Sequence, residues 1–416
     1  MRLLLINQFF WPDTAPTGRF LLDVTCALDA EAIQMTAICG PAGYGITDDA
    51  APPPVRILRP PSMRFSRDAV ARILSYASFL AGAVVAGFRV GRPDIVLTLT
   101  TPPLTSVFGR LLKLSRGCRH FIWEMDVYPD IAVDLGVLKR YSMATCVIGA
   151  LADWSRRNAD GIIVLGEDMK ARLIARDIPE HKIHVAENWA DAAEIVPVPF
   201  LEGPLVVYYS GNFGLAHDID TIAAAVKALA NDFRFRFIFA GDGIRREQMK
   251  NVCREPSISN VSFRPHCSRF ELGTSLAQGH LGLVTQLPQT CGSIVPSKTY
   301  GIMAAGRPIL YIGPREGTPA RIIERFQCGW QINPGDRDAL IGLLHKLESE
   351  RSLIVEAGAR ARQAFEAHYD RSTGTARVAK ILGLELAKVG HAVPDGPMTP
   401  YPVASVSDRV KAAAAG

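Results

Sequence analysis

The chain has 416 residues, of which 48% are hydrophobic and 21% charged. This length predicts two domains, and the composition excludes a disordered protein. Eight scattered cysteines without a CxxC pair and the absence of a signal peptide exclude a disulfide-rich secreted fold and indicate a reduced, cytoplasmic setting.

The net charge of +5 is unevenly distributed. Residues 56–119 hold eleven Lys or Arg residues against only Asp68 and Asp94. This basic stretch predicts an anionic partner. Because its charges are interleaved with aliphatic residues and no recognition module is present, a membrane surface is favoured over nucleic acid.

The first elements predict a doubly wound α/β lobe. Arg2–Ile6 is a buried strand, Asn7–Gly18 is a turn-rich loop, apolar residues from Phe20 to Leu28 share a helical face, and Met35–Cys39 is a second strand. No GxGxxG fingerprint follows the first strand, which disfavours a nicotinamide enzyme.

The stretch Ser75–Phe88 is an uncharged run of fourteen residues flanked by arginines. A spanning helix needs about 20 apolar residues, so the run is too short to cross a bilayer. Two interpretations remain: a buried core helix, or a helix that dips into one leaflet. The next predicted helix, Leu104–Leu114, places Arg110 and Lys113 beside apolar residues, and we expect both helices on one basic, membrane-facing side.

Three carboxylates lie at the carboxyl end of the strand predicted at His120–Met125, where open α/β sheets place their sites. They are Glu124, Asp126 and Asp130. Glu124 or Asp126 could act as a base toward an acceptor hydroxyl. The alternative is a helix cap or a structural salt bridge.

The remaining pattern divides the chain. Proline-rich residues 192–204 are the predicted linker between a first domain, 1–191, and a second domain, 205–370. Helical patterning continues from Gln363 to about Val389, and a helix at 371–389 could return to the first domain. The composition of residues 390–416 predicts a disordered tail.

In the second domain, two predicted strands run into glycine loops. Leu205–Ser210 leads to residues 211–214, and Phe235–Ala240 leads to residues 241–243. Such loops indicate close backbone approach to a ligand. Asn212, His217 and Arg264 are further polar candidates. Asp218 and Asp220 match a helix cap better than a metal site, and no histidine has metal-site spacing.

Residues 292–308 read GSIVPSKTYGIMAAGRP. They predict a glycine turn and a helix from Lys298 to Ala305, with Ser297 as its cap and Gly306 as its end. Unpaired amides ahead of this helix would suit an anion. Lys298 adds a positive charge where a diphosphate would lie.

Here the chain resembles the retaining glycosyltransferases of family 4, which have the α/β GT-B fold of two facing Rossmann-like lobes. It is most similar to the branch that includes N-acetyl-fucosamine transferases of bacterial O-antigen assembly. The motifs are PSKTYGIMAAGRP at 296–308, EMDVYPD at 124–130, ADGIIVLGEDMKARL at 159–173, KIHVAENWAD at 182–191 and YSGNFGLAHDI at 209–219.

The resemblance implies a role for each matching position. Residues near the diphosphate would be Gly211, Asn212, Gly214, His217 and Lys298; those near the nucleoside Gly241, Asp242, Gly243 and Arg264; and those facing the sugar Gly292, Ser293 and Ile294. Asp126, with Glu124 beside it, would face the acceptor, and Gly18 and Arg19 would lie on the acceptor side. No metal or cofactor is implied.

Four positions depart from the family pattern. Ser293 and Gly301 stand where the wider family has glutamates, and Asn212 and His217 stand where it has Arg and Lys. The nearer branch tolerates Gly at the second glutamate position. The expected diphosphate site therefore depends mainly on Lys298.

The sequence thus predicts a retaining glycosyltransferase that moves a sugar from a nucleotide donor, a UDP-sugar, to a lipid-linked, polyprenyl-type acceptor in surface-polysaccharide assembly. It would lie in the cytoplasm, peripherally on the inner face of the plasma membrane, bound to anionic lipid and not to nucleic acid. The alternatives are a sugar-nucleotide 2-epimerase of the same fold and a non-catalytic scaffold that binds nucleotide sugar or lipid.

Overall fold

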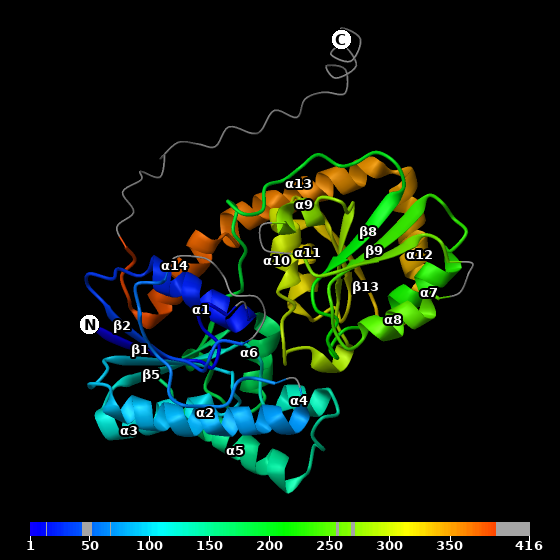
Figure 1. Ribbon diagram of the computed structural model, residues 1–416. Helices are drawn as coiled ribbons and strands as arrows, with labels where there is room; N and C mark the ends of the chain where they lie inside the picture. The colour runs from blue at the N-terminus through cyan, green and yellow to red at the C-terminus, as the bar shows by residue number, and fades with distance from the viewer. Residues whose placement is uncertain (14, 44–51, 67, 255–257, 268–270, 388–416) are drawn as a thin grey trace. The chain divides into compact units, whose positions relative to one another are not determined.

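The computed structural model describes residues 1–13, 15–43, 52–66, 68–254, 258–267 and 271–387. Within them, two parallel β-sheets form the centres of two lobes, and helices flank each sheet (Figure 1). The predicted α/β fold with two Rossmann-like lobes is confirmed. The tail predicted at 390–416 lies outside the described residues.

The first lobe is built on a seven-stranded sheet in the order β3-β2-β1-β4-β5-β6-β7. Its strands are β1 (Arg2–Ile6), β2 (Gln34–Ile38), β3 (Arg56–Leu58), β4 (Ile95–Leu99), β5 (Arg119–Glu124), β6 (Gly161–Val164) and β7 (Ile183–Val185). Its helices are α1 (Pro16–Ala27), α2 (Ala69–Arg89), α3 (Thr105–Arg116), α4 (Asp130–Asp134), α5 (Met143–Arg157), α6 (Glu167–Ile174) and the 3-10 helix η1 (Glu180–Lys182).

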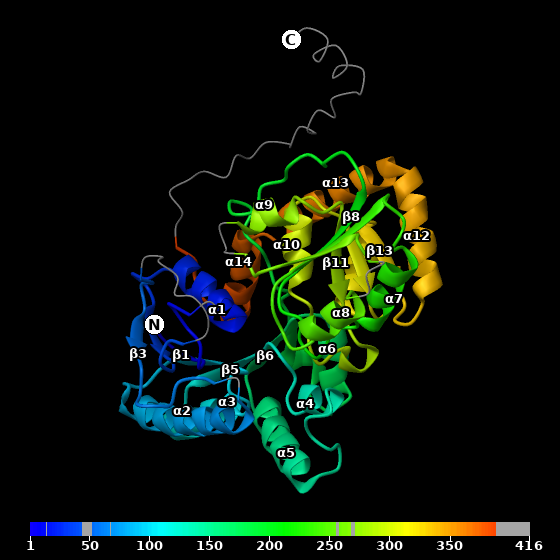
Figure 2. The same ribbon diagram turned by 45° about the vertical axis from the view of Figure 1, so that its right-hand side comes forward.

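Strand β1 shows how this sheet is buried on both faces, because alternate side chains of a strand point to opposite sides. Leu3 shares one apolar cluster with Val24 of α1, whereas Leu4 shares another with Phe79 of α2. Helices α2 and α3 lie on the same side of the sheet in both views (Figures 1 and 2). Helix α3 contacts both α2 and α5, so these three helices form one outer layer.

The second lobe is built on a six-stranded parallel sheet in the order β10-β9-β8-β11-β12-β13. Its strands are β8 (Leu205–Ser210), β9 (Phe235–Ala240), β10 (Val261–Arg264), β11 (Leu281–Thr285), β12 (Ile309–Ile312) and β13 (Gly329–Ile332). Its helices are α7 (Asp220–Ala228), α8 (Arg246–Val252), α9 (Leu272–Leu276), α10 (Lys298–Ala304), α11 (Thr318–Phe326), α12 (Arg337–Ser349), α13 (Arg351–His368) and the 3-10 helix η2 (Pro288–Thr290). The strand order reverses between β8 and β11, a position where open sheets bind ligands.

The last helix, α14 (Arg371–Leu382), belongs to the first lobe by its packing. Val378 and Leu382 are fully buried in the same apolar cluster as Val24 of α1. Figure 1 shows α14 next to α1.

The helix predicted at 371–389 ends early, at Leu382, and the helical pattern that continues from Gln363 is not a single helix. Asp370 interrupts it, because its carboxylate accepts from the Ser372 amide at 3.2 Å and starts a new helix. Gly383, with φ of 68°, ends that helix after Leu382.

Helix α2 is longer than the fourteen-residue run that the sequence indicated. Asp68 caps it by accepting from the amides of Val70 and Ala71 at 3.1 and 3.0 Å, so the helix begins before Arg72. By length and composition it could cross a membrane, and the prediction that it is too short is wrong. Only 22% of its most apolar window is buried, which also contradicts a buried core helix.

Helix α5 buries its polar side. Thr145, Asp153, Ser155 and Arg156 are buried against the lobe. The exposed large apolar side chains of α5 are Met143, Val147 and Leu151. This is the reverse of an ordinary surface helix, whose apolar stripe faces the core.

Candidate active site

Lys298 lies at the centre of the candidate donor site. It is the first residue of α10, and its side chain crosses Gly211 in the loop after β8. A β-carbon at position 211 would come within 2.5 Å of Lys298 Cε, and Gly211 has φ of 130°. Only glycine suits this position, and it allows the lysine to reach the loop residues beyond.

The Lys298 ammonium has only neutral partners among the described residues. Its Nζ lies 3.2 Å from His217 Nε2, 3.5 Å from the Asn212 carbonyl oxygen and 4.9 Å from the centre of the Tyr209 ring. Desolvation lowers the pKa of Lys298 to about 7. A positive group without a carboxylate partner is suited to bind an anion, which would favour its charged form.

His217 is held as a neutral imidazole that can accept from Lys298. Its Nδ1 lies 2.9 Å from the Thr285 carbonyl oxygen, which can only accept, so Nδ1 carries the proton and Nε2 is the acceptor. Burial, followed by the nearby Lys298 charge, lowers the pKa of His217 to about 3. The lysine from α10 therefore supplies the charge that the loop itself lacks at Asn212 and His217.

The unpaired amides predicted ahead of α10 are not found at Ser293 and Ile294. Both donate to the Thr290 carbonyl oxygen, at 3.0 and 3.4 Å, because η2 turns the chain there. Ser297 precedes α10 as predicted, but its side chain makes no capping hydrogen bond. These two amides are therefore not available to an anion, and the positive charge of the candidate site comes from Lys298.

The two glycine loops pack against each other. A β-carbon at Gly241 would overlap the Gly211 carbonyl oxygen, and one at Gly243 would come 2.5 Å from the Phe213 carbonyl oxygen. The Phe213 amide donates to the Asp242 carbonyl oxygen at 2.7 Å. The approach of one loop to the other explains Gly241 and Gly243, for which we had expected the approach of a ligand.

The other predicted donor residues lie around these loops. Gly214 has more room, since the nearest atom to a β-carbon there would be Asn212 Nδ2 at 3.7 Å. Arg264 ends β10, and its guanidinium donates to the Gln278 side chain. Its carbonyl oxygen accepts from the Gly241 amide at 3.1 Å, so Arg264 supports the second glycine loop.

Asp126 lies two residues beyond Glu124, the last residue of β5. Burial, followed by the charge of Glu124, raises the pKa of the Asp126 carboxyl to about 6. Its amide donates to Thr100 Oγ1 at 3.4 Å. A carboxylate with this pKa can accept a proton near neutral pH, as a general base must.

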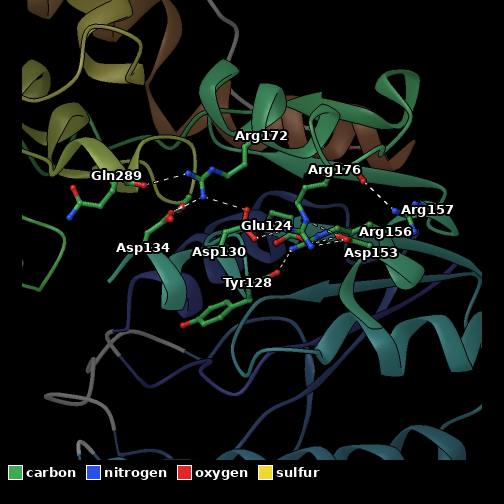
Figure 3. A network of polar contacts seen from close by, with 11 residues as sticks. Glu124, Tyr128, Asp130, Asp134, Asp153, Arg156, Arg157, Arg172, Arg176 and Gln289 are labelled. Atoms are coloured by element: carbon green, nitrogen blue, oxygen red, sulfur yellow. Dashed lines mark hydrogen bonds and ion pairs between the residues drawn. The ribbon is translucent and has the colours of Figure 1, made fainter. Parts of the chain in front are cut away.

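Glu124 takes part in a buried ion pair. It is 2% exposed, and its Oε1 accepts from Arg156 Nε at 2.7 Å. Arg156 also donates to Asp153 Oδ1 at 3.1 Å and to the Tyr128 carbonyl oxygen at 2.9 Å (Figure 3). The structural salt bridge is the interpretation that fits Glu124, which corrects its assignment as a base. Asp130 likewise pairs with Arg176, at 2.8 Å.

The residues expected to face the sugar contact the first lobe instead. The Ser293 side chain is fully buried and donates to Asp134 of α4. Gly292, with φ of 75°, leaves room for the Asp168 carbonyl oxygen, and Ile294 forms an antiparallel bridge with Asp126. The Ser293 side chain thus faces a carboxylate of the other lobe rather than an open site.

The acceptor-side residues have structural contacts. A β-carbon at Gly18 would come 3.0 Å from the Phe9 carbonyl oxygen, so Gly18 lets α1 pack on the preceding loop. Arg19 lies 3.8 Å from Glu194, near the start of the predicted linker.

Sequence reasoning missed Arg156, Arg172 of α6, and Arg176 just beyond the end of that helix. Their only local signal is the polar spacing of Asp153 and Arg156 along α5, which predicts an internal ion pair but no partner. Among the described residues, no group of three His, Cys, Asp or Glu side chains could hold a metal ion.

Comparison with known proteins shows which proteins this chain is similar to. Residues 17–189 match the model of the "Glycosyl transferase 4-like domain". The "Probable glycosyltransferase WbjE" of Pseudomonas aeruginosa is 27% identical over 367 residues, which cover 83% of this chain and 89% of that protein.

Two solved structures share the fold. WaaG, a glycosyltransferase involved in lipopolysaccharide biosynthesis, has a TM-score of 0.69 and 14% identity, covering 92% of this chain and 100% of that one. Anabaena HepE in complex with UDP-glucose has a TM-score of 0.66 and 13% identity, covering 92% and 99%. The fold is therefore GT-B, and the matches together support a glycosyltransferase enzyme.

Proposed function

We propose that the protein transfers a sugar from a UDP-sugar to a lipid-linked acceptor, with retention of the anomeric configuration, during assembly of a bacterial surface polysaccharide. Lys298 would hold the diphosphate that leaves with the nucleoside, and Asp126 would accept the proton of the acceptor hydroxyl. The reaction would take place on the inner face of the plasma membrane.

One observation carries this proposal: the partly buried Lys298 ammonium lies among neutral groups at the switch point of the second sheet. A leaving diphosphate develops negative charge, and a fixed positive group beside it stabilises that charge in the transition state. HepE, which shares the fold, was crystallised with UDP-glucose, which supports UDP as the nucleotide.

The donor site can be tested by titration calorimetry with UDP. Lys298→Ala should weaken binding by about 1.5–3 kcal/mol, the range for a hydrogen bond to a charged group. Lys346→Ala, an exposed lysine in the last turn of α12, is the matched control and should bind UDP as the wild type does. Equal affinity of wild type and Lys298→Ala would remove Lys298 from the site.

The reaction itself is tested by incubating UDP-sugars with a polyprenyl-diphosphate-linked sugar acceptor. Transfer to the lipid, with the donor's anomeric configuration in the product by NMR, is expected. A 2-epimerase would instead convert the donor without any acceptor. A scaffold would bind UDP and leave both substrates unchanged.

The membrane part of the proposal rests on the outer layer of α2, α3 and α5. Helix α2 buries a stripe of Ser75, Phe79, Ala83 and Gly87, four residues apart, against the lobe. Its opposite side exposes a second apolar stripe, where Val70 is 67% and Ile73 65% exposed. The exposed large apolar residues of this layer are Val70, Ile73, Leu74, Val85, Phe88, Leu111, Leu114, Met143, Val147 and Leu151.

The charge of this layer is positive. Besides Lys113 and Arg156, its basic residues, counted with the segment before α5, are Arg72, Arg89, Arg110, Arg116, Lys139, Arg140 and Arg157. The only carboxylate within the three helices is Asp153, which is buried with Arg156. Lys113, expected on this side, instead pairs with Asp160 at 2.7 Å. An apolar layer with arginines fits a bilayer of anionic lipids, which would also deliver a lipid-linked acceptor.

Liposome flotation tests this surface. The wild type should bind vesicles that contain phosphatidylglycerol and bind phosphatidylcholine vesicles less. The double variant Ile73→Ser, Leu74→Ser should lose most of this binding, whereas Phe233→Ser, Ile244→Ser, which removes two exposed apolar residues of the second lobe, should keep it. A wild type that stays soluble without detergent and ignores anionic vesicles would contradict the proposal.

A further inference from the structure

The loop after η2 joins the second lobe to the first through backbone pairing. The Val127 amide donates to the Ser293 carbonyl oxygen at 2.8 Å, and Asp126 forms an antiparallel bridge with Ile294. The candidate base is therefore one residue from a hydrogen bond to the lobe that carries Lys298. Any shift of this loop would move Asp126 relative to a donor bound at Lys298.

Side-chain hydrogen bonds also hold the loop after η2, next to the backbone pairing of Val127 with Ser293. Ser293 Oγ donates to Asp134, whose carboxylate also accepts from Arg172 Nη1 at 2.7 Å. Arg172 Nη2 reaches the Gln289 carbonyl oxygen at 3.4 Å, so one guanidinium contacts both lobes (Figure 3). The side chains of Ser293 and Asp134 are both almost completely buried. A hydrogen bond to a buried carboxylate is strong and fixes the relative position of its two partners.

A second contact lies near the start of α6. Asp168 accepts from Thr318 Oγ1 at 2.6 Å and from the Thr318 amide at 3.3 Å, so a carboxylate of the first lobe caps α11 of the second. Gly166 makes this approach possible, because a β-carbon there would overlap Thr318 Oγ1. Both contacts use α6, whose residues Asp168 and Arg172 are one turn apart.

This arrangement explains why a glutamate would be unsuitable at position 293. Asp134 and Asp130 already share Arg172, at 2.7 and 3.4 Å. A third carboxylate in the same buried place would have no positive partner left, and the like charges would repel. Serine instead donates a hydrogen bond that Asp134 accepts. Serine in place of the family's glutamate at position 293 therefore fits the contact between the two lobes.

We propose that Asp134, Arg172 and Ser293 are positioning residues: together they hold the 289–294 loop in the register that places the Asp126 carboxyl against the bound donor. This inference rests on the proposed glycosyl transfer. It assigns these three residues no contact with substrate, and their effect on turnover acts through the loop.

The test combines kinetics with amide exchange in the full-length protein. Ser293→Ala and Asp134→Asn should lower kcat by about 10- to 100-fold, as a small misplacement of reacting groups does. The affinity for UDP should stay unchanged, and the Val127 amide should exchange faster. Ser293→Glu, which restores the family's residue, should lower kcat at least as much as Ser293→Ala.

Two variants serve as controls. Glu247→Gln removes an exposed 2.7 Å pair with Lys250 within one helix, and Ser349→Ala removes an exposed hydroxyl that donates within α12. Neither should change kcat or the exchange of Val127. If Asp134→Asn does not fold, the kcat and the Val127 exchange of Ser293→Ala are sufficient to test the proposal.

The possible results separate the two proposals. Higher turnover in Ser293→Glu, or unchanged Val127 exchange and kcat in Ser293→Ala while the wild type transfers sugar, would overturn this inference alone. Absence of transfer by the wild type with every UDP-sugar would overturn the proposed function, and with it the positioning role, whatever the exchange data show.

Discussion

Binding of UDP should draw a proton onto the protein at mildly alkaline pH. Desolvation lowers the pKa of Lys298 from 10.5 to about 7, and no carboxylate among its described neighbours offsets this. At pH 8 only about a tenth of the unliganded protein would carry the proton on Lys298. A diphosphate beside the ammonium would restore a high pKa, so binding should take up about 0.9 proton per site.

The direction of the pH dependence follows from the same values. The free protein loses the Lys298 proton as the pH rises through 7, whereas the complex keeps it. Affinity for UDP should therefore fall with rising pH, by about tenfold per unit above pH 7.5. The terminal phosphate of UDP has a pKa of about 6, so at pH 8 the ligand itself contributes almost nothing.

Calorimetry in two buffers of different ionisation enthalpy measures the uptake directly. The apparent binding enthalpy at pH 8 should differ between the buffers by about 0.9 times the difference of their ionisation enthalpies. Lys298→Met should abolish the difference, and Lys346→Ala should preserve it. Zero uptake by the wild type, or equal uptake by Lys298→Met, would refute the reasoning.

Three further predictions concern the base, the buried ion pair and the glycine loop. Asp126→Asn should lower turnover with little change in UDP affinity, and a fully active variant would remove Asp126 from the chemistry. The kcat of the wild type should rise with pH until about 6, the pKa of Asp126, because only the ionised carboxylate is a base. Arg156→Ala leaves Glu124 buried and unpaired and should cost about 3–5 kcal/mol in urea unfolding, against under about 0.5 for the exposed Arg157→Ala; similar costs would show that the pair is unimportant. Gly211→Ala should displace Lys298 and weaken UDP binding without changing liposome binding, and normal UDP affinity would contradict the contact between the two residues.

Local signals in the sequence were sufficient for the sheets and for the position of Lys298. Continuous apolar runs such as Leu205–Ser210 predict buried parallel strands, and Gly306, with φ of 65°, follows α10 as expected. Asp218 accepts from the Thr221 amide at 3.0 Å, so the helix-cap interpretation is confirmed. These features depend on neighbours within a few residues, which periodicity and capping rules describe.

Features that depend on distant partners were out of reach. Glu124 meets Arg156 from a helix 32 residues later, and Ser293 meets Asp134 from the other lobe. No local rule distinguishes a carboxylate that pairs in this way from one that faces a substrate. For the same reason the glycine loops were predicted to contact a ligand. In the structure, Gly241 is needed because the backbone of Gly211 leaves no space for a β-carbon there.

The return of α14 to the first lobe has a consequence for biosynthesis. The side chains of Val378 and Leu382 complete the cluster around Val24, but they emerge from the ribosome only after the entire second lobe. A nascent chain of about 200 residues therefore has an unfinished hydrophobic core, and such species are prone to aggregate. A recombinant fragment that ends in the linker should have the same incomplete core and aggregate. Co-expression of a peptide spanning 370–386 should complete the core and keep the fragment soluble.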